Sequence, residues 1–394
     1  MPATANRPTQ AKRTHGWMGI KRGHNAHPVE WVAEKFIALV SLSAILMIFL
    51  IFIFIGREAL PIFLGQMNSS PKQEVIPPEK IDTLAPEELR TYLGLTPDEF
   101  ARMDREMKVG LMEIKVEAGE ESSDSPDAHI NTTEWRYLLG PYKWEGYDKP
   151  EYIWQPVGNI HKYNIVPLLI GSLKVSIIAM ILAVPLAIGA AIYVSQLASP
   201  RVKEFLKPII EMLSAIPSVV LGFFALLVMA SVMQSVFGYE TRLNSFLAGT
   251  ALALAVVPLV FSISEDALTS VPRSYSQAAL ALGASKWQAA SQIVLPAALP
   301  GVFAACVLGF GRALGETMIV LMTSAASVVS WSIFDSARPI TATIAAELLE
   351  AVVGGHHYRM LFMLGTLLFI FTFVLNLIGD VVMNRLKGRL EGKK

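Results

Sequence analysis

The sequence contains a single cysteine, Cys306, so an internal disulfide and a cysteine-rich metal site are both excluded. Charge is also scarce: Asp, Glu, Lys and Arg make up 17% of the 394 residues, against about a quarter in a typical soluble domain. The shortage is concentrated in long stretches that carry few or no ionisable side chains. Such apolar stretches are typical of membrane-spanning helices. The sequence therefore predicts a membrane protein.

Six apolar segments are long enough to cross a membrane as helices. We expect them at residues 36–55, 166–194, 208–236, 246–262, 299–322 and 360–378. The first segment carries no charge and is too long for a secretory signal, whose apolar core has about 7–15 residues and precedes a small-residue cleavage site. We therefore expect an uncleaved first helix and an all-α polytopic fold with six transmembrane helices.

Charge is distributed unevenly although the formal net charge is zero. Residues 57–162 hold 20 acidic and 12 basic residues, a net charge of −8, so the remainder of the chain carries +8. Both chain ends are basic, and Lys and Arg favour the cytoplasmic side of a membrane. Six spans place both ends on one side. We therefore expect both termini in the cytoplasm and the acidic segment outside it.

The chain is expected to have five parts. They are a cytoplasmic tail (1–33), a first transmembrane helix (34–56), an extracytoplasmic acidic insert (57–164), a core of five transmembrane helices with a cytoplasmic loop at 265–298 (165–382), and a basic cytoplasmic tail (383–394). The insert is either a tolerated surface insertion or a docking surface for an external partner, because surface loops accept insertions and also carry function.

Two short helices are expected in the insert. Residues 96–99 read Thr-Pro-Asp-Glu, a capping box with proline at the first helical position. The helix that begins there is expected to run to about Val109 and to stop at Gly110. A second helix is expected at residues 86–93, and the Glu/Ser/Asp-rich residues 117–128 are expected to form a mobile loop.

Prolines interrupt three of the expected spans. A proline leaves one helical carbonyl without its donor, and within lipid that carbonyl needs a neighbouring helix or a water-lined cavity. Packed kinks are favoured for Pro185 and Pro258, because prolines are frequent in membrane helices. A cavity is favoured at Pro217, because the hydroxyl groups of Ser214 and Ser218 flank it.

The sharpest chemical signal lies in the expected fifth span, where Arg312 and Glu316 are four residues apart and so share a helix face. Each costs about 2.5–3.5 kcal/mol near the membrane centre on insertion scales. The pair could neutralise itself and lock the span to its neighbours, or it could line a polar pathway with Thr317. The guanidinium fork suits phosphate-like oxyanions. We expect Glu316 to pair with Arg312 when the pathway is empty and to release it when an anion arrives.

The polar stretch at residues 265–292 is the second signal. Helix-forming residues dominate 275–288, Gly283 interrupts them, and Pro296 and Pro300 follow where the chain returns to the membrane. These features predict a short amphipathic helix on the cytoplasmic face. Such a helix is an interaction surface.

This stretch resembles the cytoplasmic EAA loop of ABC importer permeases in its spacing. The residues that carry the resemblance are Gln277, Ala278, Ala279, Gly283, Ile293, Val294, Leu295 and Pro296. The family motif begins with a glutamate where this chain has Gln277. A glutamine can form a hydrogen bond at this position but not a salt bridge.

Four further segments are similar to the phosphate permeases of the PstC and PstA branch of that superfamily. They are residues 216–222 (IPSVVLG), 311–318 (GRALGETM), 343–347 (TIAAE) and 154–156 (WQP). The sequence of residues 311–318 is more similar to the PstC type than to the PstA type. The resemblance extends from about Trp154 to the C-terminus, and the acidic insert lies outside it.

The resemblance implies one half of an importer in the bacterial inner membrane. A PstC-like and a PstA-like permease would form the pathway, two copies of a cytoplasmic ABC ATPase would drive it, and an extracytoplasmic phosphate-binding protein would deliver the substrate. The chain has no G-x-x-x-x-G-K-[ST] phosphate loop, so ATP is expected on the partner ATPase. We expect no cofactor, metal, catalytic residue or nucleic-acid partner for this chain.

Two groups of residues are expected to carry this function. The pathway residues are Arg312, Glu316, Thr317, Ser218 and Ser214. The ATPase-coupling residues, in the loop at 276–296, are Gln277, Ala278, Ala279, Gly283, Leu295 and Pro296. The EAA helix would seat in a groove of the ATPase and transmit its closure as a rigid-body movement of the spans.

Other functions remain open at this point. The substrate could be another oxyanion, such as sulfate, molybdate or phosphonate, or the chain could be a membrane protein that signals phosphate status through its insert or N-terminal tail. A membrane enzyme is less favoured, because the histidines are few and lie in loops or at span ends: His129, His161, His356 and His357. Adjacent residues do not share a helix face, so we expect His356 and His357 to be a solvated loop pair rather than a metal site.

Overall fold

The computed structural model describes residues 28–67, 81, 84–93, 95–123, 127, 130–158, 160–325 and 329–390. The chain divides into two units, residues 1–54 and residues 55–394. In the first unit the described part, from Pro28, belongs to one helix, α1 (Pro28–Phe63), whose last residues lie in the second unit. The two units are described separately.

The prediction of six transmembrane helices is confirmed. Six segments of the described part are long and apolar enough to cross a membrane: Trp31–Phe63, Val166–Leu197, Ser218–Phe237, Ser245–Thr269, Lys286–Gly315 and His356–Leu386. They are built on α1, α6 (Val166–Ile192), α8 (Ser218–Phe224) with α9 (Ala230–Phe237), α10 (Ser245–Thr269), α13 (Leu295–Gly315) and α16 (His356–Leu390). Short π-helical turns extend or join them at Tyr193–Leu197, Ala225–Met229 and Ala289–Val294.

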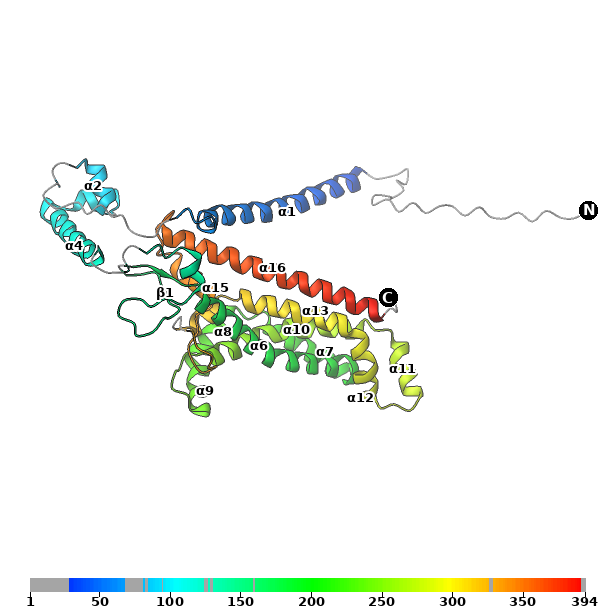
Figure 1. The fold of residues 1–394 in the computed structure, drawn as a ribbon. Helices are drawn as coiled ribbons and strands as arrows, with labels where there is room; N and C mark the ends of the chain where they lie inside the picture. Colours follow the sequence, from blue (N-terminus) through cyan, green and yellow to red (C-terminus); the bar gives the residue numbers. More distant parts are fainter. Residues whose placement is uncertain are drawn as a thin grey trace, which may run out of the picture. The chain divides into compact units, whose positions relative to one another are not determined.

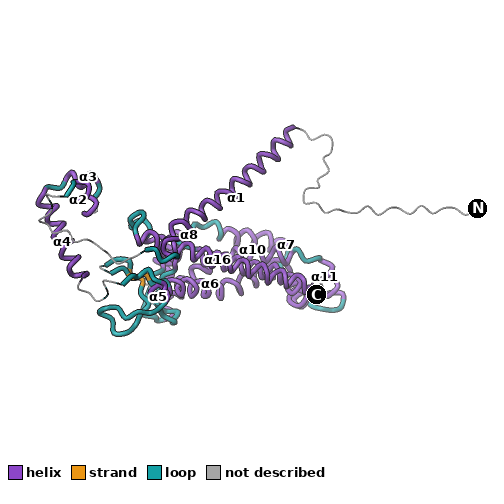
Figure 2. The backbone as a smooth tube through the Cα atoms, turned by 45° about the horizontal axis from the view of Figure 1, so that its top comes forward, coloured by secondary structure: helices purple, strands orange, loops and turns teal. Residues whose placement is uncertain are grey.

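The helices α6, α10, α13 and α16 form the bundle of the second unit, as Figure 1 shows. Helix α6 buries an alanine face with a four-residue repeat: Ala179, Ala183, Ala187 and Ala191. Small side chains let membrane helices approach closely. The resulting van der Waals packing stabilises the bundle, because the hydrophobic effect is weak between helices that are surrounded by lipid. The bundle is therefore held by close backbone packing, and Figure 2 shows it as almost entirely helical.

Gly249 sets the closest approach between α6 and α10. A β-carbon built on Gly249 would lie 2.5 Å from Cγ2 of Ile178, well inside van der Waals contact. We expect Gly249→Ala to destabilise the purified protein in detergent by about 1–3 kcal/mol, because overpacking forces the helices apart. The control is Gly189→Ala on α6, where a β-carbon meets nothing within 4 Å. Equal thermal unfolding midpoints for the two variants would contradict the prediction.

The expected third span is wrong at its N-terminal end. Residues 200–213 form a separate helix, α7 (Pro200–Leu213), and the chain leaves helical geometry before α8 begins at Ser218. Pro217 has φ −57° and ψ 136°, and its ring disfavours helical geometry at the preceding residue. A continuous helix across residues 208–236 is therefore excluded, because the chain breaks at residues 214–217 between α7 and α8.

The expected fifth span, at 299–322, is also interrupted. Helix α13 ends at Gly315, and Glu316 is extended with φ −67° and ψ 131°. A short helix, α14 (Met318–Thr323), follows Thr317. Arg312 and Glu316 therefore do not share a helix face, because the helix ends between them.

The insert contains the expected helix α2 (Pro86–Leu93) and the expected capping box. The hydroxyl of Thr96 accepts from the amide of Glu99, whose carboxylate accepts from the amide of Thr96. The expected end at Gly110 is wrong: α3 (Pro97–Arg102) is shorter, and α4 (Arg105–Ser123) runs through Gly110. The carboxylate of Asp104 starts α4 by accepting from the amide of Met107 at 2.8 Å.

The predicted loop at 117–128 is wrong over residues 117–123, which are helical. Of the remainder, residues 124–126 and 128 lie outside the described residues, as does His129. The helices α2 to α4 surround a small apolar cluster that contains Leu89, Leu93 and Met112. This part of the insert has an apolar core of its own.

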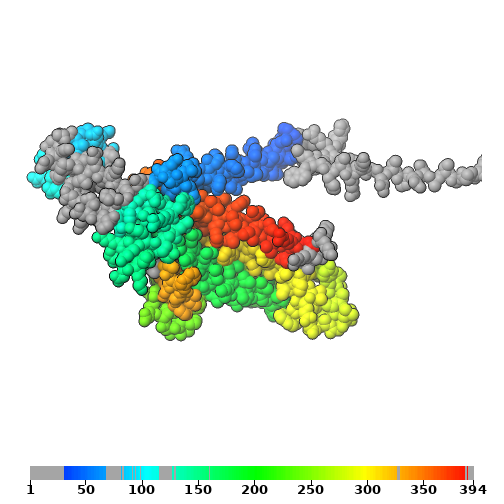
Figure 3. Space-filling view, in the orientation of Figure 1, coloured from blue at the N-terminus to red at the C-terminus, as the bar shows by residue number. Residues whose placement is uncertain are grey.

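The last part of the insert packs onto the bundle. It holds α5 (Trp135–Leu139) and a two-stranded antiparallel sheet of β1 (Trp154–Gln155) and β2 (Lys162–Tyr163). Leu138, Trp154 and Tyr163 share an apolar cluster with Ile340 of α15 (Ile340–Glu347) and Leu364 of α16. Figure 3 places this region at the end of the bundle opposite the residues around 280.

Candidate functional site

The two interrupted spans lie against each other. Gly222 of α8 faces α14, and a β-carbon built on it would lie 3.1 Å from the carbonyl oxygen of Met318. The break that precedes α14 is fixed by α15, because the Thr341 hydroxyl donates to the Glu316 carbonyl at 2.8 Å. Irregular backbone at membrane depth occurs where it is buried in protein or lines a water-filled cavity. Broken helices of this kind form the substrate sites of many transporters.

The predicted pathway residues gather at these two breaks. Glu316 and Thr317 are half-buried at the end of α13, and Arg312 is exposed on its last turn. Ser218 is the half-buried first residue of α8, and Ser214 is exposed, with its hydroxyl donating to the Glu211 carbonyl. The helices α8 and α14 pack together at Gly222 and Met318, four residues after Ser218 and one after Thr317.

The predicted ion pair between Arg312 and Glu316 is not among the ion pairs of the described residues. The helix ends between the two residues, so the four-residue spacing no longer sets their geometry. Arg312 is exposed on this chain.

The predicted loop helix is present as two helices, α11 (Arg273–Ala281) and α12 (Lys286–Gln288). Gly283 separates them with φ +92°, a left-handed conformation that glycine adopts without strain. The surface beside it is apolar and exposed, with Leu282 at 90% exposure. The other large apolar residues exposed on it are Tyr275, Leu280 and Trp287. Figure 1 shows α11 and α12 projecting from one end of the bundle.

The residues predicted to couple to an ATPase lie on this loop and at its return to the membrane. Gln277 and Ala278 are exposed on α11, and Ala279 is half-buried. Leu295 and Pro296 begin α13 directly after the π-helical turn Ala289–Val294. We call the exposed residues of α11, Leu282, Gly283 and α12 the coupling surface.

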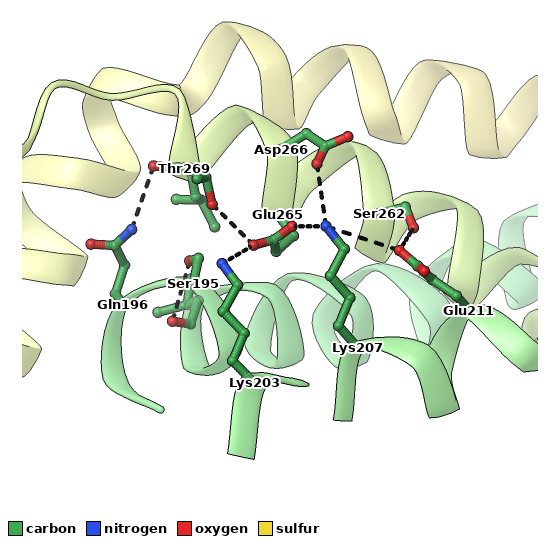
Figure 4. A network of polar contacts seen from close by, with 11 residues as sticks. Ser195, Gln196, Lys203, Lys207, Glu211, Ser262, Glu265, Asp266 and Thr269 are labelled. Atoms are coloured by element: carbon green, nitrogen blue, oxygen red, sulfur yellow. Dashed lines mark hydrogen bonds and ion pairs between the residues drawn. The ribbon is translucent and has the colours of Figure 1, made fainter. Parts of the chain in front are cut away.

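A cluster of charged residues that was not predicted from the sequence lies close to this loop (Figure 4). The Glu265 carboxylate of α10 is 1% exposed and lies 2.7 Å from Nζ of Lys203 and 2.6 Å from Nζ of Lys207. The hydroxyl of Thr269 donates to the same carboxylate at 3.0 Å. The hydrogen bond to Glu265 raises the pKa of Lys207 above its ordinary value. The sequence features that could have indicated this cluster are two lysines four residues apart, Lys203 and Lys207, and an acidic residue, Glu265, near the end of an apolar segment.

A second polar cluster lies at the other end of the bundle, around Glu347 of α15. Its carboxylate lies 3.1 Å from Arg338, accepts from the Trp154 indole at 3.1 Å, and lies 3.4 Å from Nε2 of His357. Burial raises the pKa of Glu347, and the charge of Arg338 opposes that rise. The cluster borders a cavity of about 930 Å³ that His161 and His356 also line.

The interpretation of His356 and His357 as a solvated loop pair is wrong for His357. This residue is on the first turn of α16, largely buried, and paired with Glu347. No group of three or more potential metal ligands occurs among the residues that the structure describes.

Comparison with known proteins identifies one family of membrane transport proteins. The model of the "binding-protein-dependent transport system inner membrane component" family matches residues 183–392. A probable ABC transporter permease protein, YqgH of Bacillus subtilis, is 35% identical over 236 residues, 59% of this chain and 76% of its own length. The phosphate transport system permease protein PstC of Mesorhizobium japonicum is 32% identical over 256 residues, 60% of this chain and 77% of its own.

A chain of the inward-facing MetNI methionine ABC transporter covers 56% of this chain and 94% of its own length, with a TM-score of 0.44 and 18% identity. The residues that the family model matches, 183–392, include both interrupted spans and the coupling surface. This chain therefore belongs to the family of binding-protein-dependent transport system inner membrane components, the multi-pass permeases of ABC importers.

Proposed function

We propose that this chain is the PstC-type permease subunit of an ATP-driven phosphate importer and forms half of its translocation pathway. The observation that carries the proposal is the exposed Arg312 beside two interrupted, mutually packed spans. The identity to phosphate permeases supports the choice of substrate. A PstA-like permease would complete the pathway on the exposed side of Arg312.

The pathway would bind phosphate through donors of different kinds. Arg312 supplies a planar guanidinium, which forms short, charge-assisted hydrogen bonds to oxyanions. Thr317, Ser218 and Ser214 supply hydroxyl groups at or beside the breaks. Glu316 would repel the anion once it has moved past Arg312, so the substrate is not held too tightly to leave.

The orientation follows from the alternation of the spans. Successive spans would run in opposite directions, so residues 130–158, 238–244 and 329–355 would share one side, and residues 198–199 and 270–285 would share the other. Both termini would be cytoplasmic with the coupling surface, in agreement with their basic composition. The insert and the Glu347 cluster would be extracytoplasmic.

The energy source would be a separate ATPase, present in two copies, that binds the coupling surface. The sequence has no phosphate loop of its own, so this chain would bind neither ATP nor another cofactor and would have no catalytic residue. Closure of the ATPase dimer would move the coupling surface and, through α10 and α13, the two breaks.

An extracytoplasmic phosphate-binding protein would dock on the opposite side. Several large apolar side chains are highly exposed there, outside the spans, and four of them are Val157, Leu349, Val352 and Val353. They lie on or next to the cavity beside Glu347. Exposed apolar patches rimmed by polar groups mark protein interaction sites. We call these four residues the outer patch.

The proposed function is tested by uptake of labelled phosphate into vesicles that contain the complete transporter. We expect uptake only with ATP and the binding protein present. Sulfate, molybdate or phosphonate is added in parallel at the same concentration as phosphate. Phosphate uptake that one of these anions abolishes at equal concentration would assign the pathway to that oxyanion, and no ATP-dependent uptake of any of them would overturn the proposal.

A further inference from the structure

The helix α7 is attached to the bundle by ion pairs and by partly buried apolar side chains. None of its side chains is fully buried; Leu206 and Ile210 pack partly against the core, while Phe205 and Met212 are exposed. Its strongest contacts are the two short ion pairs of Lys203 and Lys207 with the buried carboxylate of Glu265. Each of these hydrogen bonds is charge-assisted, the stronger class in proteins.

The contacts set an antiparallel register between α7 and the end of α10. Glu211 accepts from the hydroxyl of Ser262 at 3.4 Å, and Lys207 lies 3.6 Å from Asp266. Lys203 shares the Glu265 carboxylate with Thr269, the last residue of α10 (Figure 4). The two helices are therefore clamped along the final two turns of α10. We call Lys203, Lys207 and Glu265 the α7–α10 clamp.

The clamp lies between the two functional regions. Helix α11 of the coupling surface begins at Arg273, only a few residues after the end of α10. In the other direction, α7 leads directly to the break at residues 214–217 and to α8, which packs on α14. The clamp therefore connects a displacement of the end of α10 to the break through α7.

We propose that the α7–α10 clamp is a positioning element that couples the movement of the ATPase-facing loop to the interrupted third span. The proposal rests on the proposed transport function. Two lysines on one buried carboxylate resist sliding of α7 along α10, because any shift of one turn leaves a charged group without its partner. The clamp thus makes α7 and α10 move as one body, which a hinge at residues 214–217 then converts into movement of α8.

The test measures ATP hydrolysis and phosphate uptake in the same vesicles of the complete transporter. We expect Glu265→Gln to lower uptake by about tenfold while hydrolysis stimulated by the binding protein stays within about twofold, a loss typical of an allosteric coupling free energy. Glu265→Asp retains the charge and should restore most of the uptake. Lys203→Gln leaves the ion pair between Lys207 and Glu265 in place. It should therefore raise the number of ATP molecules hydrolysed per phosphate transported less than Glu265→Gln does.

The matched control is Glu204→Gln, which removes an exposed carboxylate from the same helix and should change neither rate. If Glu265→Gln does not assemble, Lys203→Gln decides by the same ratio. Parallel loss of hydrolysis and uptake, or an unchanged ratio in both variants, overturns the clamp as a coupling element. Absence of ATP-dependent phosphate uptake by the unaltered protein would instead overturn the transport function itself.

Discussion

Replacing Arg312 by glutamine is expected to lower ATP-dependent phosphate uptake by at least about 30-fold, equivalent to about 2 kcal/mol, with the transporter still assembled. Arg312 is exposed on the last turn of α13, directly before the break at residues 316–317, and is the cation that we propose to bind the anion. Its removal leaves only hydroxyl donors for the anion. Arg312→Lys keeps the charge without the planar fork and should retain part of the uptake.

The control for Arg312 is Arg201→Gln, an exposed arginine outside the candidate spans. It should transport at the normal rate. Normal uptake by Arg312→Gln would show that no anion passes beside this residue. Loss of assembly instead of uptake would show that Arg312 belongs to a packing contact between the two permease chains.

The second large effect is expected at the coupling surface. Leu282→Glu should reduce co-purification of the ATPase by at least about tenfold, because a charge buried in the partner's groove without a counter-ion is strongly unfavourable. Leu282 is 90% exposed next to the left-handed Gly283, so the substitution disturbs no packing within this chain. The measurement is the ratio of ATPase to permease after purification in mild detergent.

Leu349→Glu is the matched control, since Leu349 is 92% exposed and belongs to the outer patch, which we propose to lie on the other side of the membrane. It should leave the ATPase bound and weaken docking of the phosphate-binding protein, whereas Leu282→Glu should do the reverse. If each variant loses both partners, the effect is general misfolding. If the Leu282→Glu variant still co-purifies with the ATPase, the ATPase binds to another part of the chain.

The sequence predicted the elements whose formation depends on neighbouring residues. The capping box at Thr96, the helix α2 and the six spans follow from local hydrogen bonding and from the apolar length of each segment, and the structure contains all of them. The coupling loop followed from Gly283 and the spacing around it. The ends of helices were less predictable: α3 ended early because Asp104 starts a new helix.

The interruptions at residues 214–217 and 316–317 were not predicted as breaks, although Pro217 marked the first. Length and hydropathy alone predict one continuous helix for a run of apolar residues. Whether the helix is interrupted depends on neighbouring residues that form hydrogen bonds with the backbone groups left free at the break. Thr341, which is 25 residues away in sequence, supplies such a partner to Glu316.

What the amino-acid sequence by itself determined is the membrane location, the number of spans and the family motifs. Tertiary structure alone decided which charges meet. Glu265 and its two lysines are about 60 residues apart, and Glu347 meets Trp154 across 193 residues. The physical reason is that a charge within an apolar bundle is stable only beside a counter-ion, and packing of distant helices, rather than local sequence, brings that counter-ion into place.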